Sequence, residues 1–269
     1  MLSDLKDKAV LITGGTKGIG LATGLAFARQ GARVWLTHRW ASADESQIVR
    51  RFADEGLPPP HIVQADVANK EETAVLLEQI KQHHEHIEAF ISNVAFGCIV
   101  GDLEDYKLRS LFRSIEYSAW PFFQYPSEIQ KLFGRWPRYV VGLSSGGPDH
   151  YYQNYDFVAA ARAAMETLCR YMNYRLLAED VRINVVRSLL VRTDSLRATF
   201  GAEFEAFAER FNMKRLFISE DEIANAILGL CSGLMDGVRG QVLTVDRGTT
   251  FFDNLMRIYN ERELLDQEL

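Results

Sequence analysis

Short apolar runs alternate with longer helical stretches along almost the whole of this 269-residue chain. Each run is nearly continuous in apolar and β-branched residues, which is typical of strands buried on both faces of a parallel sheet. The stretches between them repeat apolar residues at helical spacing. This alternation predicts an α/β fold, a doubly wound parallel sheet of about seven strands with helices on both faces. The predicted strands are residues 8–13, 32–37, 61–66, 87–92, 138–144, 181–186 and 240–245.

One late segment, residues 193–217, departs from the alternation. Its large apolar side chains recur at helical spacing, at Leu196, Phe200, Phe204, Phe207 and Phe211. In a doubly wound sheet this position lies near the carboxyl ends of the strands, where ligands bind. We therefore expect a substrate lid, with plain core packing as the alternative. No low-complexity linker or repeat divides the chain, so a single domain over residues 1–269 is predicted.

Composition argues against several classes of protein. A net charge of −6 does not suit a nucleic-acid binder, and no apolar run is long enough to span a bilayer or form a signal peptide. The cysteines are odd in number and far apart, which supports neither a disulfide framework nor a zinc site. The histidines show no metal-ligand spacing. A cytoplasmic protein without a bound metal is predicted.

The glycine-rich segment VLITGGTKGIG, residues 10–20, joins the first predicted strand to the first predicted helix. Its glycines permit a tight turn and a close backbone approach, while the helix N-terminus offers free N–H groups to a pyrophosphate, as in Rossmann-like folds. This strand-loop-helix context favours a dinucleotide site over a turn without a ligand. The predicted phosphate-binding residues are Gly14, Thr16, Lys17, Gly18, Ile19 and Gly20.

The end of the second strand indicates which dinucleotide binds. An acidic residue there would bind the free 2′-hydroxyl of the adenosine ribose. This chain has His38 and Arg39 instead, and Lys17 lies in the glycine-rich loop. Because a guanidinium suits a phosphate, we predict NADPH rather than NADH. The alternative is that these cations merely solvate a surface.

The Thr-Gly-x-x-x-Gly-x-Gly spacing at 13–20 resembles the short-chain dehydrogenase/reductase family, and the resemblance covers nearly the whole chain. ADV at 65–67 is similar to that family's adenine-contacting segment, and ISNVAFG at 91–97 to its Asn-Asn-Ala-Gly segment. The threonine after the sixth strand matches the one that contacts the nicotinamide carboxamide. The resemblance implies further cofactor-binding residues: Asp66, Val67, Asn93, Ala95 and Thr193.

The catalytic stretch of that family normally has a serine and then a tyrosine and a lysine four positions apart, but no lysine occurs between Ser144 and Leu168. Matching RAAMETL to the family's KAALEAL puts Arg162 at the lysine position and Ser145 at the serine position. Tyr155 lies seven residues before Arg162. Positions i and i+7 share a helix face, so Tyr155 would point into the same pocket roughly 4.5 Å further along the axis.

Tyrosine followed by six residues and then lysine is the pattern of the enoyl-acyl-carrier-protein reductase branch, which QNYDFVAAARAAMETLCRYM at 153–172 resembles. An enoyl thioester receives hydride on its β-carbon, and charge develops on an oxygen three bonds away, so a proton donor set one turn back suits this reaction. The resemblance implies NADPH-dependent reduction of an enoyl thioester linked to coenzyme A or to an acyl carrier protein. Tyr155 would stabilise or protonate the enolate, and Arg162 would hold the nicotinamide ribose. It also implies a homotetramer or dimer.

Arginine differs from lysine in length and donor geometry, so alternatives stay open. Arg162 could work with Tyr155 in an altered geometry, the substrate could be unusual, or the protein could bind the cofactor without reducing anything. The runner-up activity is a carbonyl reductase of secondary metabolism with a relocated tyrosine. The non-enzyme alternative is a cofactor-binding scaffold.

Two further features bear on the substrate. Bulky residues at 187–190 replace the family's small Pro-Gly or Gly-Gly turn, which predicts a reshaped pocket floor. A basic rim could receive an acidic carrier protein, although scattered solvated charges are the plainer interpretation. Its candidate members are Lys17, Arg192, Arg197, Lys214 and Arg215.

Overall fold

The computed structural model describes residues 5–40, 43–210 and 217–265. Its strands form one sheet in the order β3-β2-β1-β4-β5-β6-β7, and every neighbouring pair is parallel. The strand order reverses at β1, so the carboxyl ends of β1 and β4 form the switch point at which open α/β sheets bind ligands. The seven predicted strands are confirmed, as β1 (Ala9–Ile12), β2 (Arg33–His38), β3 (His61–Gln64), β4 (Ile87–Ser92), β5 (Tyr139–Ser145), β6 (Arg182–Ser188) and β7 (Val242–Val245).

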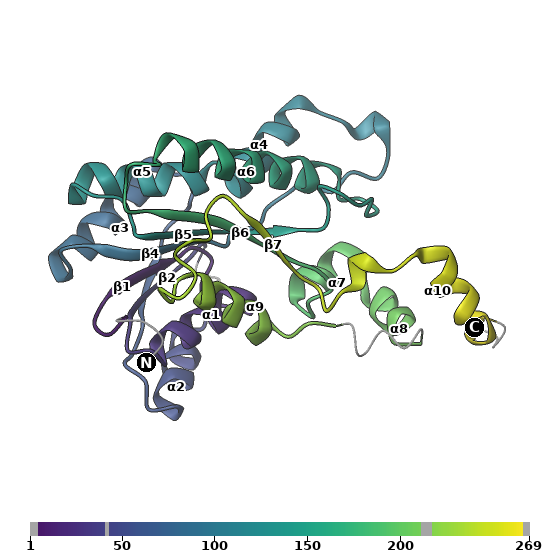
Figure 1. Ribbon diagram of the computed structural model, residues 1–269, viewed down its shortest axis with the longest axis horizontal. Helices are drawn as coiled ribbons and strands as arrows, with labels where there is room; N and C mark the ends of the chain where they lie inside the picture. The colour runs from purple at the N-terminus through teal and green to yellow at the C-terminus, as the bar shows by residue number, and fades with distance from the viewer. Residues whose placement is uncertain (1–4, 41–42, 211–216, 266–269) are drawn as a thin grey trace.

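Helices cover both faces of the sheet, which confirms the doubly wound α/β prediction (Figure 1). Alternate residues of β1 enter the two cores: Val10 and Ile12 join one, Ala9 and Leu11 the other. Because both faces are buried, the strands read as continuous apolar runs. One face carries α1 (Gly18–Ala28), α2 (Glu45–Asp54) and α9 (Glu220–Leu230); the other carries α3 (Lys70–His83), α4 (Leu108–Ser118), α5 (Pro121–Phe133) and α6 (Asp156–Arg175).

Local capping fixes where several of these helices begin. The side chain of Asn69 accepts hydrogen bonds from the first turn of α3, and Ser219 and Glu222 form a reciprocal capping box at the start of α9. The start of α6 is set differently. Asn154 adopts a positive φ of 62°, a conformation that asparagine tolerates better than most residues, and Tyr155 follows as the N-cap. The catalytic tyrosine candidate therefore stands just before the helix.

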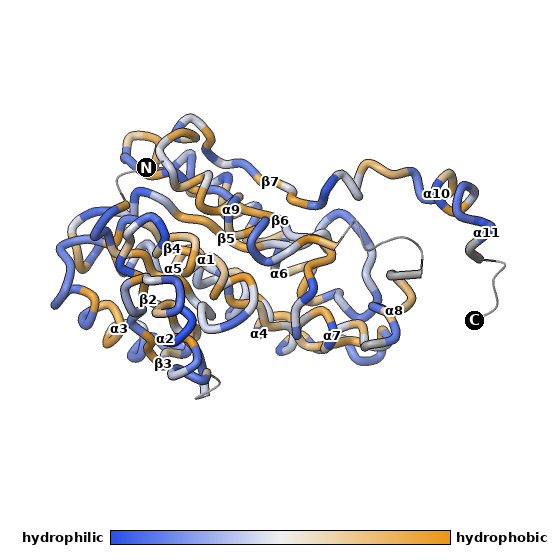
Figure 2. The backbone as a smooth tube through the Cα atoms, turned by 90° about the horizontal axis from the view of Figure 1, so that it is seen from below, coloured by the Kyte–Doolittle hydropathy of each residue, from blue (hydrophilic) through white to orange (hydrophobic). Residues whose placement is uncertain are grey.

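The predicted lid folds as two helices at the carboxyl ends of the strands, α7 (Asp194–Phe200) and α8 (Ala202–Arg210). Gly201, with φ of 82°, separates them in a conformation that suits glycine. Phe211, Lys214 and Arg215 lie outside the described residues. Beyond β7 the chain forms the short helices η3 (Thr249–Phe251), α10 (Asn254–Asn260) and α11 (Arg262–Leu265). This C-terminal segment projects away from the body of the molecule (Figure 2).

In the part of the chain that the structure describes, no helix has both the length and the apolar character that a membrane crossing requires. All seven strands join one sheet. The boundaries predicted for the domain, residues 1–269, stay a prediction.

Candidate active site

The glycine-rich loop between β1 and α1 has the geometry of a phosphate cradle. Gly14 and Gly18 adopt positive φ angles of 62° and 56°, and a Cβ added to Gly20 would lie 2.5 Å from the carbonyl oxygen of Gly14. Lys17, the exposed N-cap of α1, makes no side-chain capping bond. The N-terminal N–H groups of α1 can therefore serve an anion. Thr16 is buried in this loop, and Ile19 packs against the adjoining core.

Asn93, which follows β4, is hydrogen-bonded to the glycine-rich loop. Its amide nitrogen donates to the carbonyl oxygens of Thr13 (3.1 Å) and Gly14 (2.9 Å), and its backbone N–H donates to Thr13 Oγ1 (3.2 Å). These bonds tie the loops after β1 and β4 together at the switch point. Ala95, two residues on, is exposed at the same edge of the sheet.

The adenine end of the predicted site is built around Asp66, just after β3. Its carboxylate accepts a bond from the Tyr117 hydroxyl (3.1 Å) and lies 3.3 Å from Nη1 of Arg39. The Arg39 guanidinium lies over two aromatic rings, 3.3 Å from the centroid of Trp40 and 4.8 Å from that of Tyr117. Among the residues that the structure describes, its buried Nε has no hydrogen-bond partner. The side chain of Val67 belongs to the core.

The side chains of the two basic residues at the end of β2, His38 and Arg39, lie on different sides of the sheet. Successive strand residues point to opposite faces, so Arg39 lies beside Asp66 while His38 turns towards α2. The His38 side chain is 6% exposed, and its Nε2 lies 3.5 Å from the Glu45 carboxylate in the first turn of α2. Of the pair, Arg39 is therefore the residue whose side chain lies beside the predicted adenine-contacting segment.

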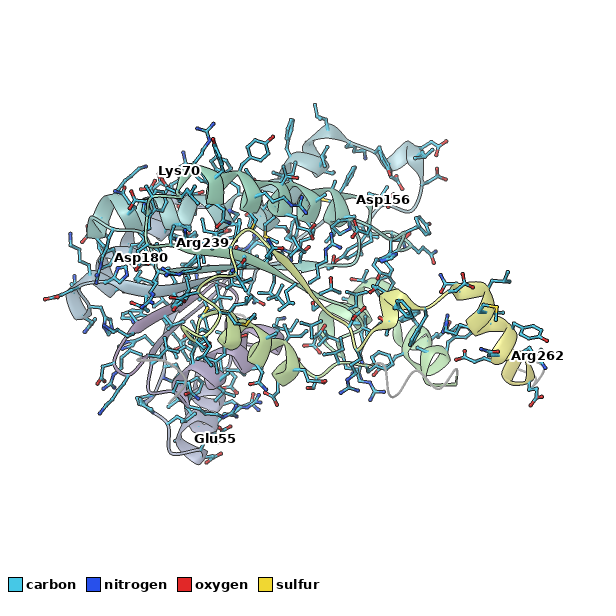
Figure 3. The ribbon with its side chains drawn as sticks, viewed as in Figure 1. Glu55, Lys70, Asp156, Asp180, Arg239 and Arg262 are labelled. Carbon is cyan, nitrogen blue, oxygen red and sulfur yellow. The ribbon has the colours of Figure 1, made fainter. Side chains whose placement is uncertain are left out.

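The catalytic candidates come together at the carboxyl ends of β4 and β5. The Tyr155 hydroxyl donates to Ser145 Oγ at 3.1 Å. Arg162, two turns along α6, is 4% exposed and donates from Nη1 to the carbonyl oxygen of Ser118 (3.1 Å) and from Nη2 to that of Val94 (3.4 Å). Its Nε is buried and has no hydrogen-bond partner within the described ranges. In Figure 3, Asp156, the first residue of α6, lies to the right of the sheet, whereas Asp180 and Arg239 lie towards the left.

Burial lowers the pKa of the Arg162 guanidinium, and the nearby Tyr155 and Glu166 raise it, in that order of importance. Arginine nevertheless stays charged at neutral pH because its ordinary pKa is above 12. The site thus holds a buried positive charge with one unused N–H donor beside the tyrosine. The prediction that Tyr155 and Arg162 share a pocket stays a prediction.

A valine takes the place that a tyrosine would have in the family's usual spacing. A Cβ added to Gly97 would come within 2.0 Å of Val158 Cγ2, so the backbone at Gly97 lies directly against this side chain. A bulky ring at 158 would have to displace that backbone. Local packing therefore disfavours a tyrosine at position 158. The tyrosine of this segment lies instead at 155, seven residues before Arg162.

Aromatic residues enclose Tyr155. The Tyr152 ring meets it edge-on at 5.9 Å between centroids, and the Phe200 ring from α7 stacks on it at 6.4 Å. Phe204 extends this wall, with its centroid 5.2 Å from that of Phe200. Tyr151, by contrast, is 84% exposed. The segment predicted as a lid is thus packed on the tyrosine.

The remaining predicted positions complete the pocket. Thr193 caps α7 by accepting a bond from Leu196 N (3.2 Å), and its methyl lies 3.9 Å from a Cβ placed on Gly18. It therefore lies between the lid and the phosphate loop. Leu189 packs on Gly146 beside Ser145, in keeping with a reshaped floor, whereas the Arg187 guanidinium is engaged in ion pairs. Within the described ranges, no three His, Cys, Asp or Glu side chains are grouped to hold a metal.

Sequence reasoning missed Tyr117 of α4 and Glu166 of α6, which support the two ends of the site. Tyr117 lies outside the glycine-rich and catalytic segments, and Glu166 lies within RAAMETL at 162–168, where no role was predicted for it. Glu166 stands one turn after Arg162, and this four-residue spacing is the only local signal that could have indicated it.

Known proteins similar to this chain share its family and its fold. Residues 14–250 match the family described as enoyl-(acyl carrier protein) reductase. The chain is 28% identical to 1-cyclohexenylcarbonyl-CoA reductase of Streptomyces collinus over 242 residues, 88% of this chain and 85% of that protein. It is 24% identical to the NADPH form of enoyl-[acyl-carrier-protein] reductase, FabI, of Staphylococcus aureus (91% and 97%), and 25% identical to the NADH form of Escherichia coli (91% and 94%).

Solved structures of similar fold include 7α-hydroxysteroid dehydrogenase complexed with NADH and 7-oxo glycochenodeoxycholic acid. It superposes with a TM-score of 0.79 at 25% identity, covering 92% of this chain and 95% of that one. Levodione reductase gives a TM-score of 0.81 at 20% identity, covering 93% and 100%. Fold and site together define an oxidoreductase of the short-chain dehydrogenase/reductase superfamily, a class that uses a nicotinamide dinucleotide. Within it, the chain belongs to the enoyl-(acyl carrier protein) reductase family.

Proposed function

We propose that this protein is an NADPH-dependent reductase of the carbon–carbon double bond of an enoyl thioester. The observation that carries the proposal is the bond from Tyr155 to Ser145, made while Val158 fills the position of a ketoreductase tyrosine. The cofactor would supply the hydride. Tyr155 would stabilise or protonate the oxygen on which negative charge develops, three bonds from the β-carbon.

Arg162 would position the cofactor by its nicotinamide ribose. Two of its N–H donors are held by the carbonyl oxygens of Ser118 and Val94, which fixes the plane of the guanidinium. The partnerless Nε then remains for a ribose hydroxyl. The buried positive charge also favours negative charge developing near Tyr155.

Arg39 would select the cofactor. The guanidinium, which lies over the rings of Trp40 and Tyr117, forms a cationic surface at the end of β2, where a 2′-phosphate would bind. The Asp66 carboxylate 3.3 Å from Arg39 holds the guanidinium in place before the phosphate arrives. Relatives of this chain include both NADH and NADPH forms, so the preference rests on these residues.

The acyl group is proposed to arrive on coenzyme A. Two members of the candidate basic rim, Arg192 and Arg197, both face Glu205 of α8, at 3.5 Å and 2.8 Å. This pairing reduces the positive field that an acidic carrier protein would need. One relative is named as a CoA-thioester reductase.

Stopped-flow loss of NADPH absorbance tests the proposal, with crotonyl and longer enoyl thioesters of coenzyme A, N-acetylcysteamine and an acyl carrier protein. Turnover of enoyl but not β-keto substrates is the expected result. Turnover of β-keto substrates alone would select the carbonyl reductase. Calorimetric binding of NADPH without turnover of either set would select the scaffold.

We also propose that the protein works as a homo-oligomer through the outer faces of α4 and α6, which lie side by side. Leu108 and Phe112 of α4 and Tyr171 and Tyr174 of α6 are exposed there, and a groove of about 770 Å³ runs along α4. Light scattering of the wild type and of Tyr174→Glu tests this. A monomeric wild type would contradict it.

A further inference from the structure

A charged network outside the catalytic residues ties together four segments around Tyr155. Its centre is Glu166 of α6, which is 3% exposed. The carboxylate accepts from Arg187 Nε (2.7 Å) and Nη2 (2.6 Å), and from Ser144 Oγ (2.7 Å). Nη1 of Arg187 reaches outward to the Asp149 carboxylate. Because the Glu166–Arg187 contact is bidentate, it fixes distance and orientation together.

Each contact joins a different element to the site. Ser144 is the strand residue directly before Ser145, and Arg187 comes from β6, the neighbouring strand. Asp149 lies in the turn after β5, where the N–H groups of Asp149 and His150 donate to Gly146 O at 3.1 and 3.0 Å. That turn leads directly to Tyr155. The network therefore contacts this segment at Asp149 and flanks it in sequence, through Ser144 before it and Glu166 in the helix that follows it.

The environment of the charged groups favours their ionised forms, which strengthens the network. Ion pairing raises the pKa of the Arg187 guanidinium and lowers that of the Asp149 carboxyl, so both charges are favoured. Glu166 also lies one turn after Arg162 and opposes the loss of charge that burial causes there. Two arginines thus face two carboxylates around the buried end of α6. A buried ion pair is weak evidence for stability but suits a role in fixing geometry.

We propose that Asp149, Glu166 and Arg187 are positioning residues that hold segment 146–155 in place, and so set the Tyr155–Ser145 geometry on which turnover depends. The inference rests on the proposed reductase function. Reactions are sensitive to such placement, since an error of about 1 Å in a reacting group costs on the order of 100-fold in rate.

Asp149→Asn is the sharpest variant, because this side chain is 57% exposed and its loss leaves the buried Glu166–Arg187 pair intact. We expect kcat to fall about tenfold or more, with thioester KM and NADPH Kd within about twofold of wild type. Asp149→Glu keeps the carboxylate and should recover most of kcat. A kcat within about twofold of wild type for Asp149→Asn would overturn the proposal.

A matched control lies at the opposite ends of the same strands. Asp236 pairs with Arg138 (2.8 Å) and Arg182 (3.0 Å) and accepts from the Tyr139 hydroxyl (2.9 Å), where β5 and β6 begin. Asp236→Asn should lower the unfolding midpoint without changing kcat. If it lowers kcat as much as Asp149→Asn does, the effect is general destabilisation and the positioning role is wrong.

Hydrogen exchange separates this inference from the proposed function. Asp149→Asn should speed amide exchange across 146–155, whereas Asp236→Asn should not, whether or not any substrate is reduced. If the wild type reduces no substrate but this exchange pattern appears, the reductase proposal fails and the network's hold on the segment stands. Unchanged exchange in Asp149→Asn would overturn the network proposal alone.

Discussion

The hydroxyl of Tyr155 donates a 3.1 Å hydrogen bond to Ser145, although the tyrosine precedes α6 and the serine ends β5. In Tyr155→Phe the ring packing with Tyr152 and Phe200 should persist while the proton donor is lost. We expect kcat for enoyl thioesters to fall by about 100-fold or more, because a positioned acid contributes roughly 10²–10⁴-fold. Steady-state kinetics and NADPH titration measure this.

The matched control for that variant is Tyr151→Phe, since Tyr151 is the exposed tyrosine of the same segment. Its kcat should stay within about twofold of the wild type. If kcat in Tyr155→Phe stays as close to the wild type as in this control, Tyr155 is not the proton donor, and the proposed mechanism is wrong.

Arg162 should be needed for cofactor binding rather than for the fold alone. In Arg162→Met the carbonyl oxygens of Ser118 and Val94 lose their donor, but Glu166 keeps Arg187 as its partner. Hydrogen bonds to a charged group contribute about 1.5–3 kcal/mol, so NADPH Kd should rise roughly 10- to 100-fold. Arg162→Lys retains the charge and should lose less. Equal NADPH affinity in the wild type and Arg162→Met, by calorimetry, would exclude the ribose role.

Arg39 should distinguish the two cofactors. Arg39→Gln removes the guanidinium that lies over the rings of Trp40 and Tyr117. It should raise Kd for NADPH roughly tenfold or more, with Kd for NADH changed by less than about twofold. The control is Arg33→Gln at the start of β2, where the arginine pairs with exposed Asp7. An equal rise in Kd for NADPH and for NADH in Arg39→Gln would show that Arg39 supports the adenine pocket and does not bind a 2′-phosphate.

The parts of this structure that could be predicted from the sequence are those set by short-range patterns. The strands followed from continuous apolar runs, the phosphate loop from its glycines, and Tyr155 from its distance to Arg162. His38 was grouped with Arg39 by adjacency, although strand alternation sends the two side chains to opposite faces. The Arg187–Glu166 pair joins a strand to a helix 21 residues earlier, and no local pattern encodes that contact.

Acid should destabilise the protein through histidines whose environment in the folded chain favours the neutral imidazole. Burial, then Arg135 and Lys8, lowers the pKa of His86 to about 4, and burial also lowers the pKa of His61 and His84. An unfolded histidine has a pKa near 6.5, so below that pH the unfolded chain binds protons that the folded chain does not. The resulting stability is complete above about pH 6.5 and is lost progressively as the pH falls towards 4. Urea unfolding midpoints should therefore decrease from pH 7.5 to pH 5. His86→Gln should flatten this dependence, whereas an identical pH dependence in His86→Gln and the wild type would show that His86 takes no part in it.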